Sequence, residues 1–585
     1  MSGETLSRVA DIKRPSEEFP RKYVPLDVDF MVWDNIEPLY IELTERVIES
    51  VESLEKWIYD MSEFYSVLSE DGSRCSIAMT CNTEDKDAEE AYLHIITEIQ
   101  PKCKPFDFQL QKKIIDNPFT AELNEDRYGL MLRSTRNQVE LFREENVDLE
   151  TEIDKLSQQY QKLMGAMTVE FRGEEKTMQQ MGVFFEENDR ELRKEVFELL
   201  SKRRLQDADK MEELFNEMLK LRVQVAKNAG FENYRDYMFR EYERFDYTPD
   251  DCEKFHSAVE KIVVPLMRRR MEERRVALGI DTVRTYDTSC DKYGRAPQKP
   301  FKDTQELIHG CQKIFNKVDP ELGGFFQTLI DLGLLDLDSR KGKAPGGYQT
   351  SLHEVRHPFI FMNAVGLNRD LFTLLHEGGH SFHSTLARNE PLMSLRHAPM
   401  EFCEVASMAM EHVSLPHFDE FYEDAEAARA INDHFNGDIF LLAWVATIDA
   451  FQHWIYTNPD HTNEERAAKW LELDKRFGAG LDHSGYEESL KYRWHAQLHI
   501  FEVPFYYIEY GIALLGALQV WRNSLDSVEN AITAYKEALT LGGTKTLPEL
   551  FEAANTKFDF SADTIQPLMD AVEAEIERVS KLEKH

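Results

Sequence analysis

Two histidines and a glutamate stand at a spacing that can bind and use a metal ion. Residues 376–380 read His-Glu-Gly-Gly-His. On a helix, His376 and His380 lie one turn apart on the same face, so both imidazoles can bind one metal ion. Glu377 is rotated to the neighbouring face, where it could take a proton from a water that the metal activates. The pattern predicts zinc-assisted hydrolysis of an amide bond.

The residues in and around this motif indicate a buried helix in which two positions require the smallest residue. Apolar side chains flank the motif on both sides, at Leu371, Phe372, Leu374, Leu375, Phe382 and Leu386. Because buried histidine and glutamate need partners, a metal site is favoured over exposed polar residues. Gly378 and Gly379 inside the helix cost about 2 kcal/mol of helix propensity relative to alanine. We therefore expect a close backbone approach or a substrate where their side chains would lie.

A zinc site of this type needs a third protein ligand and an open position for water. Residues 400–411 read as a second buried helix with Glu401, Glu404 and Glu411 near one face. Spacing alone does not choose between Glu401 and Glu404. Glu404 is the predicted ligand because it lies deeper in the helix, where an unpaired carboxylate would be costly. Glu411 is predicted to accept a hydrogen bond from a ligand imidazole.

These motifs resemble those of the oligoendopeptidase F branch of the thimet-oligopeptidase-like zinc metallopeptidases. The chain carries His-Glu-x-Gly-His-x-x-His and, further on, Glu-Val-Ala-Ser. The resemblance implies that His376, His380 and Glu404 bind one zinc ion per chain. It also implies that Glu377 is the general base. His383 fits the extra histidine of the extended motif, and a hydrogen-bonded core histidine is the alternative interpretation.

The resemblance runs from about residue 110 to about residue 570. A loop before the apolar segment 357–363 resembles the family's glycine-tyrosine loop, which implies substrate-binding residues at Gly346, Gly347 and Tyr348. Family position implies candidates for the donor that stabilises the oxyanion, namely His499, Tyr507 and Tyr510. Tyr506 has helix spacing to Tyr510 too and ranks lower on family position alone. Gly378 departs from the larger apolar residue usual in these relatives, which leaves the shape of the nearby pocket open.

Composition restricts the partners and the compartment. The formal charge of −38, from 107 acidic and 69 basic residues, argues against a nucleic-acid partner. The longest apolar run, at 512–520, is too short to span a bilayer, and the N-terminus opens no signal sequence. The seven cysteines are scattered without a Cys-x-x-Cys pair. These features favour a reduced, cytoplasmic protein without disulfides or membrane contact. No motif indicates an oligomeric state.

Apolar residues at three- and four-residue spacing predict an all-α protein with few short strands. Long helical stretches are predicted over 23–69, 149–165, 190–228 and 249–278, a small hairpin within 167–181, and irregular connections over 281–302 and 339–345. We divide the chain into an N-terminal helical lobe, 1–195, and a catalytic lobe, 196–585. The resemblance implies an elongated two-lobed body with zinc deep in a channel between the lobes. A strand predicted at 359–363 could present an edge to an extended peptide or could lie in the core.

The predicted activity is that of a zinc endopeptidase acting on short unstructured peptides. One alternative is a zinc carboxypeptidase of similar helical build, which needs a cationic anchor for the substrate's terminal carboxylate at Arg356, Arg396 or Arg493. Another is a non-catalytic protein with a structural metal. Structural zinc sites usually have four cysteine or histidine ligands. Three predicted ligands with a base beside them favour catalysis. Cys403 is predicted to be a small buried hydrophobe.

Overall fold

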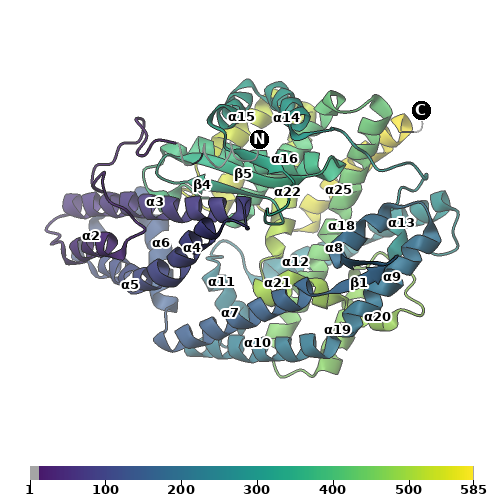
Figure 1. Cartoon of the computed structure of the whole chain (residues 1–585), viewed down its shortest axis with the longest axis horizontal. Coiled ribbons are helices and arrows are strands. Elements are labelled where there is room, and N and C mark those ends of the chain that lie inside the picture. Colours follow the sequence, from purple (N-terminus) through teal and green to yellow (C-terminus); the bar gives the residue numbers. More distant parts are fainter. Residues whose placement is uncertain (1–8, 10–11, 584–585) are drawn as a thin grey trace. The chain divides into compact units, whose positions relative to one another are not determined.

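The computed structural model describes residue 9 and residues 12–583, and it is built mainly from helices (Figure 1). The predicted all-α class with few short strands is confirmed. The chain forms two compact units of three segments each. The first contains the segment ending at Glu140, Lys299–Ala427 and Ala513–Phe558; the second contains Leu141–Gln298, Ala428–Ile512 and the segment from Asp559 on. Residue 195, where a boundary was predicted, lies in helix α9 of the second unit.

The first unit contains the candidate active-site helices. Its helices are α2 (Trp33–Glu45), α3 (Val51–Cys81), α4 (Lys86–His94), α5 (Gln100–Asp116), α6 (Glu125–Leu141, one residue past the unit), α14 (Thr304–Val318), α15 (Pro320–Leu332), α16 (Asn368–Leu386), α17 (Met400–Ser414), α23 (Val528–Thr540) and α24 (Leu547–Ala553). Helices α16 and α17 pack directly against each other, and α14 and α15 pack against α16. Most of their inward side chains are apolar and buried, so burial of these faces supplies much of the packing energy.

The second unit is almost entirely helical. Its helices are α7 (Glu144–Gly165), α8 (Met178–Gly182), α9 (Arg190–Leu205), α10 (Ala208–Asn228), α11 (Tyr234–Glu241), α12 (Pro249–Ala258), α13 (Val264–Leu278), α19 (Asn463–Phe477), α20 (Glu487–Lys491), α21 (Leu498–Glu502) and α25 (Ala562–Leu582). Two further helices begin in one unit and end in the other, α18 (Asp424–Thr457) and α22 (Ile508–Asp526). The predicted irregular connection at 281–302 holds one short 3₁₀ turn, Thr285–Asp287.

A three-stranded sheet supports the helix that carries the His-Glu-Gly-Gly-His motif. Strands β3 (Leu335–Asp338), β5 (His357–Ala364) and β4 (Tyr348–Leu352) lie in that order, with β5 parallel to β3 and antiparallel to β4. Helix α16 packs against β5. The strand predicted at 359–363 is confirmed, but the idea that it presents an edge was wrong. Strand β5 is paired on both sides, and β4 is the edge strand on the antiparallel side.

The predicted hairpin in the second unit is confirmed. Strand β1 (Thr168–Phe171) pairs antiparallel with β2 (Glu174–Thr177). The two residues between them, Arg172 and Gly173, have φ values of +54° and +84°. A two-residue hairpin turn with positive φ at both central positions matches the right-handed twist of its strands. Gly173 adopts this conformation without a side-chain penalty.

Helix α18 is the most membrane-like element among the described residues. It alone is long and apolar enough there to cross a bilayer by length and composition. However, 78% of its most apolar stretch is buried inside the protein. A core helix meets the same criteria, so this helix is weak evidence for a membrane span. The apolar run at 512–520, in α22, is likewise buried.

Candidate active site

Helix α16 carries the His-Glu-Gly-Gly-His motif. Its N-terminus is capped by the Asp370 carboxylate, which accepts hydrogen bonds from the backbone N–H groups of Val365 (2.7 Å) and Leu367 (2.9 Å). These bonds pair backbone donors that lie just before the first helical turn. One turn apart on this helix, His376 and His380 have ring centroids 4.9 Å apart. Both imidazoles are partly exposed, so the face that they share is open to a ligand.

The two glycines of the motif allow close packing, as their cost in helix propensity predicted. A Cβ atom on Gly379 would lie 2.5 Å from the carbonyl oxygen of Ala406 and 2.6 Å from the Cα of Ser407. Both atoms belong to the backbone of α17, so only glycine lets the two helices approach this closely. A Cβ on Gly378 would lie 2.6 Å from the ring of Phe315. Phe315 of α14 therefore fills the space beside Gly378, which the sequence left open.

Three potential metal ligands converge between α16 and α17. The carboxylate Oε2 of Glu404 lies 3.3 Å from Nε2 of His376 and 3.7 Å from Nε2 of His380. The ligand atoms of these three residues all lie within 4.8 Å of one another. Two imidazoles and one carboxylate form the donor set of many catalytic zinc sites. Glu401 is buried one turn earlier and is not in this group.

Hydrogen bonds orient the potential ligands. The Oε1 atom of Glu411 lies 2.7 Å from Nδ1 of His376. If Nδ1 donates to this carboxylate, Nε2 presents its lone pair on the side of Glu404. The hydroxyl of Ser407 donates to Oε2 of Glu404 at 3.1 Å. Burial alone would raise the pKa of Glu404, but the hydrogen bond from His376 and the positive charge beside it lower that pKa to about 2.

Opposite effects act on the two imidazoles. Burial alone would lower the pKa of His376, but hydrogen bonds to Glu404 and Glu411 raise it well above the ordinary value. Burial, together with the charge on His376, lowers the pKa of His380 to about 4. The carboxylates therefore favour one positive charge within this cluster. A bound cation would satisfy the same demand.

Glu377 has the environment of a proton acceptor that works near neutral pH. It lies next to the ligands in sequence, and 7% of its surface is exposed. Burial raises its pKa to about 7, and the charge of His376 acts in the opposite direction. A backbone hydrogen bond from Gln349 of β4 also lowers this pKa. The edge strand thus reaches the predicted general base, a contact that the sequence did not reveal.

The other predicted residues of the first unit are buried or held by neighbours. His383 is buried, its Nε2 has no hydrogen-bond partner, and burial lowers its pKa to about 3. The thiol of Cys403 donates to the carbonyl of Ala398 at 3.4 Å, outside the group of ligand atoms. The role of His383 beside the metal therefore stays a prediction.

The glycine-tyrosine loop is anchored between the sheet and α3. Gly346 has a φ of +98°, and its carbonyl accepts a hydrogen bond from the side chain of Asn363 at 2.9 Å. Tyr348 stacks on Phe361 with ring centroids 4.8 Å apart, and its hydroxyl lies 2.6 Å from that of Thr80. The ring is therefore held in place. Contact of Gly346, Gly347 and Tyr348 with a substrate stays a prediction.

The late aromatic segment forms a ring cluster in the second unit. The ring of His499 lies 4.8 Å from that of Tyr507 and 5.9 Å from that of Tyr510. The two tyrosine rings are 5.3 Å apart, and Tyr506 lies 5.5 Å from Tyr510. The sequence thus predicted a real cluster. Its part in the reaction stays a prediction.

Neighbouring polar groups make His499 a hydrogen-bond donor at Nε2. The indole N–H of Trp444 donates to Oε1 of Gln497 at 3.0 Å. This contact turns the Gln497 amide nitrogen toward Nδ1 of His499, 2.8 Å away. Since Nδ1 then accepts, the proton of the neutral ring lies on Nε2. Burial lowers the pKa of His499 to about 4, so the ring stays neutral at pH 7.

Comparison with known proteins identifies the family. A model described as Peptidase family M3 matches residues 183–569, and one described as Peptidase M3 N-terminal domain matches residues 26–142. The first match covers more than half of the chain and includes both the motif helix and the late aromatic segment. The chain belongs to Peptidase family M3. The resemblance to oligoendopeptidase F inferred from the motifs is confirmed.

Similar proteins support this membership of family M3. "Oligoendopeptidase F, plasmid" of Lactococcus lactis subsp. cremoris is 24% identical over 330 residues, 55% of this chain and 52% of that protein. The aligned part thus spans about half the length of that relative. An oligoendopeptidase F homolog of Borreliella burgdorferi is 22% identical over 577 residues, 93% of this chain and 90% of that protein. The solved structure "PZ peptidase A with inhibitor 2" has a TM-score of 0.86 and 25% identity, covering 96% of this chain and 100% of that one.

Proposed function

We propose that this protein is a zinc-dependent endopeptidase that cuts internal bonds of short, unstructured peptides. The observation that carries the proposal is the convergence of His376, His380 and Glu404, with ligand atoms within 4.8 Å of one another. The buried carboxyl of Glu377 beside them supplies the base that a merely structural site would lack. Because two nitrogens and one carboxylate oxygen suit zinc, the residues present fit the metal that family membership implies.

Each residue has a distinct task in the proposed reaction. Zinc, when bound, would supply the Lewis acid that polarises the scissile carbonyl and acidifies water. Glu411 holds the His376 ring so that Nε2 faces the metal site. Glu377 accepts a proton from the attacking water and passes it to the leaving amine. A pKa of about 7 suits both steps, since the carboxyl can take up and release a proton near neutral pH.

The edge strand β4 is the proposed binding surface for the peptide. Strand β5 occupies one side of β4. No strand of the described residues pairs with the other side, along which we propose that the peptide adds as a further strand. Gln349 of β4 reaches Glu377 through its backbone, so a peptide along this strand would pass the proposed base. An extended peptide advances about 3.3 Å per residue, which lets a few residues reach the metal site. The proposal therefore favours short, extended substrates over folded proteins.

The contacts of Arg396, one of the three candidate arginines, favour an endopeptidase over a carboxypeptidase. Arg356 and Arg396 line one pocket with His353 and His397. Arg396, however, donates to the backbone carbonyls of Glu390, His353 and Pro391. A guanidinium whose N–H groups already donate to carbonyl groups is poorly suited to bind a terminal carboxylate through two parallel hydrogen bonds. Arg493, the third candidate, lies over the ring of Trp444 in the second unit.

One assay tests the activity and its class together. The substrate is a quenched fluorescent peptide of about ten residues, within reach of an extended strand at about 3.3 Å per residue, with an acetylated N-terminus and an amidated C-terminus. We expect internal cleavage, loss of activity on chelation, and recovery with zinc. Cleavage of only the peptide with a free C-terminus would instead support the carboxypeptidase. No cleavage of either by the zinc-loaded protein would refute catalysis.

Matched carboxylate variants test the assigned roles. Glu404→Gln should lose zinc, whereas Glu401→Gln, one turn earlier in α17, should retain it. Glu377→Gln should retain zinc and lose turnover, because a neutral amide cannot accept the proton. Full zinc in Glu404→Gln with loss in Glu401→Gln would show that the wrong carboxylate was chosen.

We further propose that the protein works in the reducing cytoplasm. All seven cysteines are free thiols, and five of them are buried, where they are protected from oxidation. Non-reducing and reducing gels of protein from a cell lysate trapped with a thiol-blocking reagent test this. Seven blocked thiols per chain are expected, and a disulfide-linked pair would contradict the proposal.

A further inference from the structure

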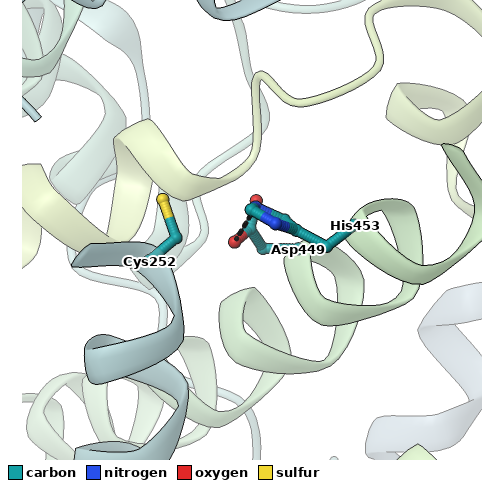
Figure 2. A group of neighbouring side chains, drawn as sticks. All are labelled: Cys252, Asp449 and His453. Atoms are coloured by element: carbon teal, nitrogen blue, oxygen red, sulfur yellow. Dashed lines mark ion pairs between the residues drawn. The ribbon is translucent and has the colours of Figure 1, made fainter. Parts of the chain in front are cut away.

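A second group of metal-ligating side chains lies in the second unit. Cys252 comes from α12, while Asp449 and His453 stand one turn apart on α18. In Figure 2 the Asp449 carboxylate lies against the His453 imidazole, and the Cys252 thiol lies to one side of the pair. The ligand atoms of the three residues lie within 4.8 Å of one another. None of the three belongs to the candidate active site, and no motif in the sequence singled them out.

This cluster contains several buried polar atoms that make no hydrogen bond. Cys252 and Asp449 are fully buried, and 6% of His453 is exposed. Three polar atoms make no hydrogen bond, namely Oδ1 of Asp449 and both ring nitrogens of His453. Each such atom ordinarily costs about 1–3 kcal/mol, and more where the group is charged. Three of them at one place indicate that a bound group satisfies them.

The distances suit a small cation with nitrogen, oxygen and sulfur ligands. Nε2 of His453 lies 3.3 Å from Oδ2 of Asp449 without the geometry of a hydrogen bond. Two atoms that each lie about 2.0–2.1 Å from one tetrahedral zinc are themselves about 3.3 Å apart. A thiol as the third group favours zinc over calcium or magnesium, which prefer oxygen.

Neighbouring side chains hold the carboxylate and pack around the imidazole. Nε2 of His256, also on α12, lies 2.7 Å from Oδ2 of Asp449, a contact typical of groups that orient a metal-binding carboxylate. The rings of Phe239 and Phe505 pack edge-on to His453 at 6.1 and 5.5 Å. An ion-pair network of Asp449 with two histidines provides partners for only one of its carboxylate oxygens. It leaves the other oxygen and the His453 ring without hydrogen bonds.

We propose that Cys252, Asp449 and His453 bind a second zinc ion, which ties α12 to α18 within the second unit. On binding, the thiol of Cys252 loses its proton to solvent and becomes a thiolate ligand. A water molecule completes the coordination. The role is structural, because all three side chains are buried and a substrate would not reach the metal. The inference does not depend on the proposed peptidase activity.

Zinc content per chain tests the second site directly. After growth with zinc and removal of loosely bound metal, we expect two zinc ions in the wild type and one in His376→Ala/His380→Ala. Cys252→Ala should also hold one. The matched control is Cys311→Ala, which removes another fully buried thiol that lies in no ligand group among the described residues, and it should keep two. Two zinc ions in Cys252→Ala, or loss of zinc only from His376→Ala/His380→Ala, would overturn the proposal.

Cobalt substitution gives a second test that does not require Cys252→Ala to fold. A near-ultraviolet thiolate-to-cobalt charge-transfer band requires a sulfur ligand, and the candidate active site offers two nitrogens and one oxygen. Cobalt-loaded His376→Ala/His380→Ala should therefore show the band, and the same protein with Cys311→Ala should keep it. Absence of the band would mean that the cluster is an ion-pair network only. Zinc retained by His376→Ala/His380→Ala at the wild-type level would instead count against the proposed active site.

Discussion

Replacing Gly379 by alanine should separate the two helices that carry the candidate zinc ligands. The new Cβ would lie 2.5 Å from the Ala406 carbonyl oxygen and 2.6 Å from the Ser407 Cα, whereas ordinary contacts begin at 3.4 Å. Helix α17 must therefore retreat from α16 by about 1 Å. The clash cannot be relieved by a rotamer change, because both atoms are main-chain. The same carbonyl accepts a hydrogen bond from the Tyr535 hydroxyl at 2.7 Å, which restricts its movement further.

Gly379→Ala should change both the unfolding free energy and the affinity for zinc. Overpacking costs about 1–3 kcal/mol, and rigid backbone atoms place this site near the upper end. Alanine regains about 1 kcal/mol of helix propensity, so the net loss of unfolding free energy is about 2 kcal/mol. Metal–ligand distances tolerate shifts of about 0.2 Å. A shift of about 1 Å between the histidines and Glu404 should weaken zinc binding at least about tenfold, the lower end for a disturbed metal site.

Urea unfolding of the zinc-free protein and chelator competition measure these two effects separately. The matched control is Gly72→Ala in α3 of the same unit, where a Cβ meets no atom within 4 Å. That variant should gain up to about 1 kcal/mol and bind zinc as the wild type does. If Gly379→Ala matched Gly72→Ala in both measurements, the close approach of α16 and α17 would not hold the site together, and the reasoning would be wrong.

Four further outcomes are expected. Glu411→Gln should weaken zinc binding about 10–100-fold in chelator competition, because it disturbs the partner of His376; unchanged affinity would contradict that role. Tyr507→Phe or Tyr510→Phe should keep zinc and lower kcat by about 10²–10³-fold with little change in KM, and two variants with wild-type kcat would make these rings core residues. Burial lowers the pKa of His353 to about 3, so the unfolded chain binds the extra proton between pH 6.5 and 3. The contribution of His353 to the unfolding free energy should be complete above pH 6.5 and should fall as the pH drops, by at most about 1.4 kcal/mol per pH unit. The unfolding free energy of His353→Gln, measured with urea, should therefore depend less on pH, and an unchanged pH dependence would contradict the assignment. Short peptides should be cut much faster than casein on gels, and equal rates would argue against strand addition at β4.

The local elements were predictable from the sequence because short-range physics determines them. The spacing of His376 and His380 needs only a helix to place both rings on one face. The hairpin at Thr168–Thr177 follows from β-branched residues around a glycine turn, and the helical class follows from apolar periodicity. The cost of two helical glycines predicted a close backbone approach or a substrate at that place. Each of these conclusions depends on residues a few positions apart.

Contacts between distant segments were decided only by the tertiary structure. Glu401 and Glu404 share a helix face, so the approach of α16 to α17, limited by Gly379, determines which carboxylate reaches His376. The sequence left open whether the strand at 359–363 lies at an edge or in the core, and the structure places β5 between β3 and β4. Phe315 beside Gly378, and Cys252 beside α18, have no local signal in the sequence. Such contacts depend on long-range packing, in which many side-chain volumes must be satisfied together, and no periodicity along the chain encodes that outcome.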